Sequence, residues 1–141
     1  MTIKEIQEEI IEEFEMFDDW MERYEYIIDL GKSLPIIDEA FKIDENLIKG
    51  CQSKVWLHSE IENDNLIFTA DSDAILTKGI VALLLRVFNN QQPSDIIEAD
   101  MDFIDKIGLK EHLSATRANG LVSMIKKIKL YALGFQMKMN Q

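Results

Sequence analysis

The sequence predicts an α+β fold, in which a small antiparallel β-sheet is flanked by helices. Two observations carry this prediction. Apolar residues recur at helical spacing toward both ends of the chain. Between them, residues 54–70 contain two short stretches rich in β-branched and aromatic residues, KVWLHSEI and LIFTA, which are separated by the turn-like NDN. We therefore expect a β-hairpin in the middle of a largely helical protein.

Two helices are expected before the hairpin. The capping-box pattern TIKE at residues 2–5 marks the start of a helix over residues 3–17, in which isoleucine and phenylalanine recur on one face. Asp18 and Asp19 are candidate N-caps for a second helix, and Gly31 is its candidate C-terminal stop.

The stretch IDENLIK, residues 43–49, suggests a further strand before the hairpin. Residues 50–53, GCQS, would then form the turn between two strands. This turn contains the only cysteine of the chain, Cys51. The thiol is therefore expected at the tip of a loop.

The part of the chain after the hairpin reads as helical. Asp71, Ser72 and Asp73 offer capping oxygens to a strongly apolar helix over residues 74–88, which we expect to be buried against the sheet. Further helices are expected over residues 94–98, 101–107 and 114–137. We expect Trp20 and Trp56 in the core, close packing around Gly120, and a solvated face formed by Lys126, Lys127 and Lys129.

Composition limits the function. A chain of 141 residues with 47% hydrophobic residues predicts one domain, residues 1–141. The net charge of −11 argues against nucleic acid or an anionic membrane as the main partner. No apolar run is long enough for a membrane span, and the acidic N-terminal stretch does not resemble a signal peptide. We expect a cytoplasmic protein with a reduced thiol.

A single cysteine excludes an internal disulfide and four-cysteine metal sites within one chain. Free cysteine most often acts as a small buried hydrophobic residue. Cys51, however, lies between Gly50 and the polar Gln52 and Ser53, outside any apolar periodic run. This setting favours a reactive thiol on a loop. Its redox or sulfur chemistry would have to be intermolecular.

The segment around Cys51 resembles the cysteine segment of the SufE family, the sulfur-acceptor proteins that work with cysteine desulfurases. The resemblance continues, in order, along most of the chain beyond the first helix. It is carried by LIKGCQSKVWL (47–57), RYEYIIDLGKSLP (23–35), FTADSDA (68–74), KGIVALLL (78–85) and HLSATRANGL (112–121). The resemblance implies a SufE/IscU-like fold, in agreement with the periodicity.

The resemblance also implies a function for Cys51. It would accept sulfur from a SufS-type cysteine desulfurase as a persulfide and pass it to a SufBCD-type scaffold for iron–sulfur cluster assembly. The pyridoxal phosphate (PLP) belongs to the desulfurase, so the chain would need no cofactor of its own. It would be a carrier and activator and not an enzyme. A single cysteine suits this role, because no second thiol can expel the persulfide as a disulfide.

A cysteine of ordinary pKa is only about 3% thiolate at pH 7, so a sulfur acceptor needs a group that stabilises the thiolate. Arg117 is the candidate, although an arginine near a helix start can also simply pair with a carboxylate. Asp71 and Asp73 are candidate partner-docking residues in addition to candidate helix caps. The remaining candidates for support of the loop and site are Gly50, Gln52, Ser53, His112 and Asn119.

One alternative from another class stays open. Cys51 could act with His112 in a free-standing thiol enzyme, either a hydrolase or a one-cysteine thiol reductase. A metal site is not expected, because Cys51, His58 and His112 lack the spacing of zinc ligands. The oligomeric state expected is a monomer or a weak dimer.

Overall fold

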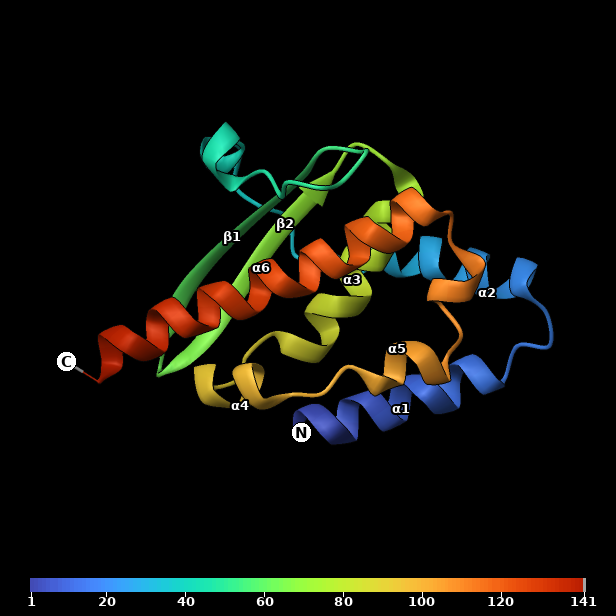
Figure 1. The fold of residues 1–141 in the computed structure, drawn as a ribbon, viewed down its shortest axis with the longest axis horizontal. Coiled ribbons are helices and arrows are strands. Elements are labelled where there is room, and N and C mark those ends of the chain that lie inside the picture. Colours follow the sequence, from blue (N-terminus) through green and yellow to red (C-terminus); the bar gives the residue numbers. More distant parts are fainter. Residues whose placement is uncertain (141) are drawn as a thin grey trace.

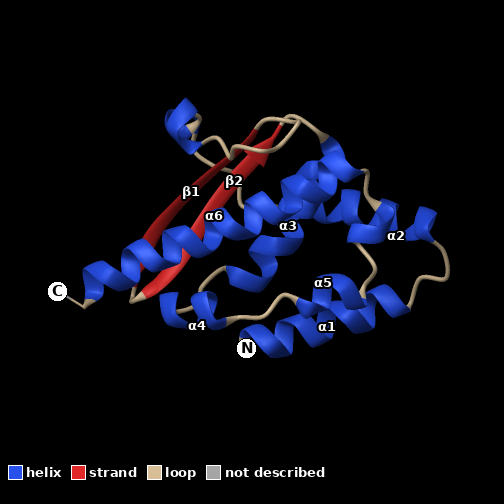
Figure 2. Cartoon of the chain, viewed as in Figure 1, coloured by secondary structure: helices blue, strands red, loops and turns tan. Residues whose placement is uncertain are grey.

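A computed structural model describes residues 1–140 and confirms the α+β class. One antiparallel hairpin lies among helices (Figures 1 and 2). The helices and strands are α1 (Ile3–Glu15), α2 (Trp20–Leu30), β1 (Val55–Glu62), β2 (Asn65–Ser72), α3 (Ile75–Phe88), α4 (Pro93–Glu98), α5 (Asp102–Lys106) and α6 (Ala115–Met139).

The hairpin forms where the sequence predicts it. Its register runs from Val55 opposite Ser72 to Glu62 opposite Asn65. Asn63 and Asp64, which close it, have φ values of 53° and 68°, the left-handed backbone that two-residue hairpin turns require. Alternate residues of β2 are buried, so one face of the hairpin belongs to the core.

Helix α3 is the centre of the core. Most of its residues are buried, because it packs against α2 on one side and β2 on another, as its apolar composition predicts. Helix α6 runs across the hairpin and beside α4 (Figure 1). The Tyr131 hydroxyl on α6 donates a hydrogen bond to the Leu57 carbonyl of β1, at 3.2 Å.

The predicted caps of the first two helices are confirmed. Thr2 and Glu5 form a complete capping box, and Asp19 accepts a hydrogen bond from the Glu22 backbone. Helix α1 ends at Glu15 instead of residue 17. Helix α2 ends at Gly31, which is its C-cap as predicted, although without a left-handed turn. The φ of Gly31 is −58°, and the chain continues into a 3₁₀ turn, Gly31–Ser33.

The strand predicted over residues 43–49 is wrong. Asp44–Asn46 forms a 3₁₀ turn, in which Asn46 also donates its side-chain amide to the Phe41 carbonyl. Local hydrogen bonding by Asp and Asn therefore overrides the apolar residues around them. Only Leu47 bridges to β1, opposite Trp56. Residues 50–53 consequently join a turn to β1 and do not connect two strands.

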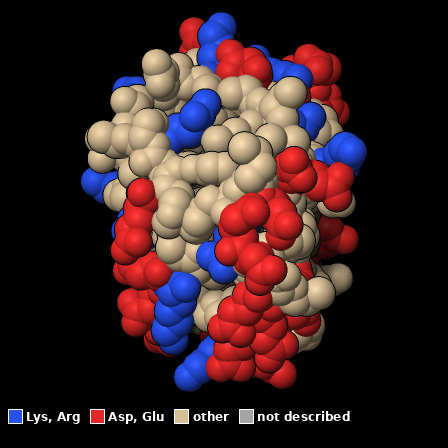
Figure 3. All heavy atoms as spheres, turned by 90° about the vertical axis from the view of Figure 1, so that its right-hand side faces the viewer, with Lys and Arg blue, Asp and Glu red and all other residues tan. Residues whose placement is uncertain are grey.

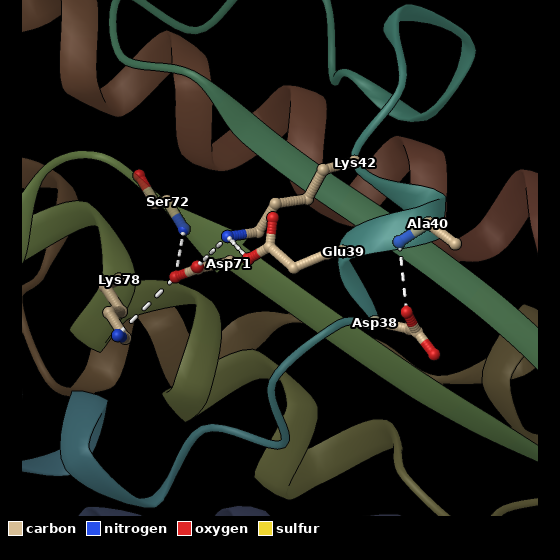
Figure 4. Close-up of polar contacts among 7 residues, drawn as sticks. All are labelled: Asp38, Glu39, Ala40, Lys42, Asp71, Ser72 and Lys78. Atoms are coloured by element: carbon tan, nitrogen blue, oxygen red, sulfur yellow. Dashed lines mark hydrogen bonds and ion pairs between the residues drawn. The ribbon is translucent and has the colours of Figure 1, made fainter.

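The predicted side-chain caps of α3 are also wrong. Ala74 is the N-cap and supplies no side-chain hydrogen bond, because the hairpin continues through Ser72. Asp71 remains within β2, where its carboxylate pairs with two lysines (Figure 4). Asp73 instead accepts a hydrogen bond from the Lys54 backbone at 3.0 Å, which ties the end of β2 to the start of β1.

Three expectations about burial need correction. Trp20 is half-buried at the edge of the core, where it stacks on His112. Trp56 is also half-buried and lies beneath the Lys42 ammonium. Lys129 is also half-buried and does not lie on a solvated face. Its ammonium donates hydrogen bonds to the carbonyls of Ile97 and Ala99, at 3.1 and 2.5 Å.

Gly79 sets the separation of α2 and α3. A Cβ built on Gly79 would lie 2.1 Å from the Ile27 carbonyl oxygen, which is backbone and cannot rotate away. Gly134, which is exposed on α6, has no atom within 4 Å of such a Cβ. The two glycines therefore form a matched pair.

We predict that Gly79→Ala lowers the free energy of unfolding by about 3 kcal/mol, because the two helices must move apart. Gly134→Ala should raise it by about 0.5–1 kcal/mol through helix propensity alone. Urea denaturation of both variants measures the difference. Equal effects of the two substitutions would show that Gly79 does not limit the approach of α2.

Candidate functional site

The cysteine loop, residues 49–53, lies at the end of the hairpin where α3 begins (Figure 2). Gly50 has a φ of +91°, a conformation that L side chains rarely adopt. A Cβ at this position would also lie 2.6 Å from the Ser123 hydroxyl on α6. The turn therefore requires Gly50, and a side chain there would also displace the Ser123 hydroxyl.

Cys51 lies against a second glycine. Its Sγ is 3.7 Å from the Gly120 carbonyl oxygen, and a Cβ on Gly120 would lie 3.4 Å from Sγ. Gly120 is buried beneath the loop, and Cys51 itself is half-buried. The close packing expected around Gly120 is therefore confirmed, and the atom it packs against is the only thiol sulfur of the chain.

A small cavity of about 20 Å³ adjoins Cys51. This volume accommodates about one water-sized atom. Its walls come from the cysteine loop, the first turns of α3 and the first turns of α6. They are formed by Cys51, Gln52, Ser53, Thr77, Ile80, Thr116, Arg117, Gly120 and Met124. The thiol thus has beside it a space close to the size of one further atom.

Burial controls the charge of the thiol in this position. Desolvation raises the pKa of Cys51 above its ordinary value of 9.0, which disfavours the thiolate. Arg117 lines the same cavity but is exposed, and within residues 1–140 its guanidinium forms no hydrogen bond or ion pair. The pairing of Arg117 with a carboxylate, weighed from the sequence, is therefore not found in that part of the chain.

Backbone hydrogen bonds hold the loop at both ends, and the Cys51 thiol is its hydrogen-bonded contact with α6 in between. On its C-terminal side, the Lys54 N–H donates to the Asp73 carboxylate at 3.0 Å, and the Lys54 carbonyl accepts from the Asp73 N–H at 3.3 Å. On its N-terminal side, the Ile48 N–H donates to the Val55 carbonyl at 2.9 Å. Five residues, 49–53, lie between these anchors.

Asp71 braces the neighbouring segment. Its carboxylate is 2.7 Å from the Lys42 ammonium and 3.5 Å from that of Lys78 (Figure 4). Burial alone would raise the pKa of Asp71, but the hydrogen bond from Lys42 and the nearby positive charge outweigh it, so the pKa is lowered. This carboxylate joins the 3₁₀ turn Glu39–Phe41 and α3 to the hairpin.

The structure separates the other candidates from the cavity. His112 stacks on Trp20 at 3.9 Å, and its Nδ1 is 2.9 Å from the Gly108 carbonyl oxygen. Asn119 lies on α6 beside Gly120 and does not line the cavity. His58 stacks on Phe41 and pairs with Glu60. Within residues 1–140 no group of three metal-ligating side chains occurs.

Sequence reasoning missed the side chains that form the cavity floor. Thr116, Gly120 and Met124 are spaced four residues apart and share one face of α6, so Gly120 could have indicated the other two. Thr77 and Ile80 share a face of α3, but their meeting with the loop depends on tertiary packing. No local sequence signal identifies them.

None of the helices in residues 1–140 is both long and apolar enough to cross a membrane.

Comparisons with known proteins agree on one family. Residues 8–132 match the family model described as "SufE: Fe-S metabolism associated domain". An uncharacterised SufE-like protein of Rhizobium meliloti is 45% identical over 132 residues, covering 90% of this chain and 94% of that protein. One of Synechocystis is 38% identical, covering 91% and 80%.

Two further similarities extend this result. A SufE-like protein of Arabidopsis thaliana, named chloroplastic/mitochondrial, is 35% identical, covering 93% of this chain and 36% of that longer protein. The solution structure of a hypothetical protein from Thermus thermophilus has a TM-score of 0.76 at 16% identity, covering 92% and 94% of the two chains. The latter supports the fold alone. Taken with the family match across most of its length, these relatives establish that the chain belongs to the SufE family and has a role in iron–sulfur metabolism.

Proposed function

We propose that this protein accepts sulfur on Cys51 from a SufS-type cysteine desulfurase, stimulates that enzyme, and passes the sulfur to a SufBCD-type scaffold. The observation that carries the proposal is the placement of the only cysteine. It lies half-buried on a loop anchored at both ends, beside a cavity of about 20 Å³. The family match supports the same assignment.

The transfer is a thiol–persulfide exchange without net oxidation. The Cys51 thiolate attacks the terminal sulfur of a persulfide on the desulfurase, and a new S–S bond forms at Cys51. The S–S bond on the desulfurase breaks, and its cysteine leaves as a thiolate. The proton lost by Cys51 restores that thiolate to a thiol. PLP, bound by the partner, supplies the chemistry that releases sulfur from free cysteine.

The cavity suits storage of the transferred sulfur. A persulfide has one more sulfur atom than the thiol, and the cavity provides room for about one atom next to Sγ. Ile80 and Met124 make part of its wall apolar. Persulfides exposed to solvent are oxidised or attacked by other thiols, so a sheltered position protects the sulfur between transfers.

Transfer requires a second, extended position of the loop. The half-buried Sγ cannot reach a recessed sulfur of the partner while it lies against Gly120. Gly50 gives the backbone freedom to move, whereas Lys54 and Ile48 hold the ends of the loop in place. Binding of the desulfurase shifts the loop outward, and the size of the shift depends on how much more tightly the desulfurase binds the extended form than the sheltered one.

Arg117 is proposed to stabilise the Cys51 thiolate during transfer. It is the cation that lines the cavity, and its guanidinium is exposed. In the extended position the thiol loses the burial that raises its pKa, and a nearby guanidinium then favours its charged form. The docking roles of Asp71 and Asp73 stay predictions. Asp73 is exposed, whereas the Asp71 carboxylate is already occupied by Lys42 and Lys78.

A thiol enzyme using Cys51 with His112 has no comparable support. The His112 ring is stacked on Trp20, and its Nδ1 is hydrogen-bonded to the Gly108 carbonyl and not to the Cys51 thiol. A cytoplasmic location and a monomer or weak dimer remain part of the proposal.

We predict that Cys51→Ser retains the fold but neither accepts sulfur nor stimulates a SufS-type desulfurase, because a hydroxyl cannot form a persulfide. Intact-mass analysis after incubation with the desulfurase and free cysteine should show additions of single sulfur atoms to the wild type only. Stimulation by the serine variant at the wild-type level would refute the carrier function and leave only passive binding.

A second prediction concerns pH. Because burial raises the pKa of Cys51, its alkylation by iodoacetamide should increase with pH through an inflection above 9.0 in the free protein. Arg117→Ala should leave this profile unchanged, since burial and not the guanidinium sets the thiol pKa in the sheltered position. An inflection below about 8.5, or one that rises in the alanine variant, would mean that the thiolate is already stabilised before the partner binds.

A further inference from the structure

Helix α6 differs in charge from the rest of the chain. All 26 acidic residues precede residue 112, whereas five of the 15 basic residues follow it. Residues 1–111 therefore carry a formal charge of −16 and residues 112–141 a charge of +5. The five cations all lie on α6, which contains no Asp or Glu. A basic helix thus lies on an acidic protein.

The outer face of α6 is also apolar. Val122, Leu130, Leu133 and Met137 are 46–61% exposed. Their spacing of eight, three and four residues places them within one stripe of an α-helix. Clusters of exposed large apolar residues mark interaction surfaces more often than isolated ones do.

This stripe forms one wall of a groove between α6 and α4. The groove has a volume of about 410 Å³ and is lined by Ile97, Val122, Ile125, Lys126, Lys129, Leu130 and Leu133. The Lys129 ammonium fixes the two walls by donating to the carbonyls of Ile97 and Ala99. Lys126 lies at the groove and is exposed. The groove is therefore preformed, apolar at its base and positively charged at its edge.

We propose that this groove, between α4 and α6, binds an acidic amphipathic helix of a partner protein. Leucine or isoleucine at i, i+4 and i+7 of such a helix would fill the apolar base. Its Glu or Asp side chains would meet Lys126, the exposed lysine at the edge of the groove.

A second copy of this chain does not fit the groove. Pairing of two α6 faces would bring lysines against lysines. The outer face of α1 is acidic, but every exposed side chain between Lys4 and Glu15 is charged. The large apolar residues of α1 face the core, so α1 offers no apolar side chains to fill the base of the groove. Figure 3 shows acidic side chains gathered on the lower part of the molecule, the side on which α1 lies. The net charge of −11 disfavours an anionic bilayer as the occupant of the groove.

The groove is separate from the cysteine site. Gly120, which faces Cys51, and Val122, which lines the groove, are two residues apart and hence about 160° apart around the helix. Leu133 lies about 20 Å further along α6 than Gly120. A partner in the groove would therefore leave the thiol accessible, so this surface can hold one protein while Cys51 exchanges sulfur with another.

The test uses the full chain and a synthetic helical peptide with leucine at i, i+4, i+7 and i+11 and glutamate on both flanks. Fluorescence anisotropy of the labelled peptide should give a dissociation constant below about 100 µM at low salt, weakening as salt is added. Leu130→Asp and Leu133→Asp should each weaken binding by roughly tenfold or more. The matched control is Met21→Asp, at an apolar residue of α2 that is 68% exposed.

The same peptide with lysine in place of glutamate should bind at least tenfold more weakly, and Lys126→Glu should reverse this preference. Cys51→Ser should bind like the wild type, so the result does not depend on sulfur transfer. Three outcomes would overturn the proposal. These are equal binding of the two peptides, stronger binding to anionic vesicles than to the acidic peptide, and a concentration-dependent dimer that Leu130→Asp abolishes.

Discussion

The contact between the cysteine loop and α6 is the constraint on which the site depends. Two glycines permit it. Gly50 passes over Ser123 on the loop side, and Gly120 removes the side chain that would otherwise stand between α6 and Cys51. A side chain at Gly50 would strain the left-handed backbone and meet the Ser123 hydroxyl, whereas a Cβ at Gly120 would come into van der Waals contact with Sγ and leave no room for a larger side chain. The sheltered thiol, its raised pKa and the adjoining cavity all follow from this close approach.

The rest of the fold supplies the two surfaces that meet there. The hairpin and Asp73 fix the ends of the loop, while the Asp71 carboxylate joins the start of α3 to the preceding turn through Lys78 and Lys42. Helix α6 is held in place from its other side, by the bonds of Tyr131 to β1 and of Lys129 to α4. The movement proposed for sulfur transfer is thus confined to the five residues 49–53 between anchored ends, an arrangement that favours a small local change over a rearrangement of the domain.

Sequence reasoning succeeded where local physics decides the structure and failed where tertiary contacts decide it. The capping box at Thr2, the hairpin and the buried α3 follow from hydrogen-bonding residues and periodicity alone. The strand expected over residues 43–49 failed because Asp44 and Asn46 prefer a tight turn, a preference that the nearby apolar residues concealed. The sequence correctly indicates four residues that line the cavity, which are Cys51, Gln52, Ser53 and Arg117. It indicates His112 equally, although His112 lies away from the cavity. Its distance from the thiol depends on how Trp20 packs, which no local pattern contains.

The central claim is that the sulfur carried by Cys51 is sheltered in the cavity against Gly120. The most direct measurement is the rate at which cyanide removes the terminal sulfur from the Cys51 persulfide, compared between the wild type and Gly120→Ala. The added methyl would lie 3.4 Å from Sγ on the wall of the cavity, which should narrow the space open to the second sulfur, while improving the helix propensity of α6. Gly134→Ala, on an open part of the same helix, is the control. The account predicts slow removal in the wild type and in the control, and clearly faster removal in Gly120→Ala. Equal rates in all three proteins, matching that of an unstructured persulfide peptide, would contradict it.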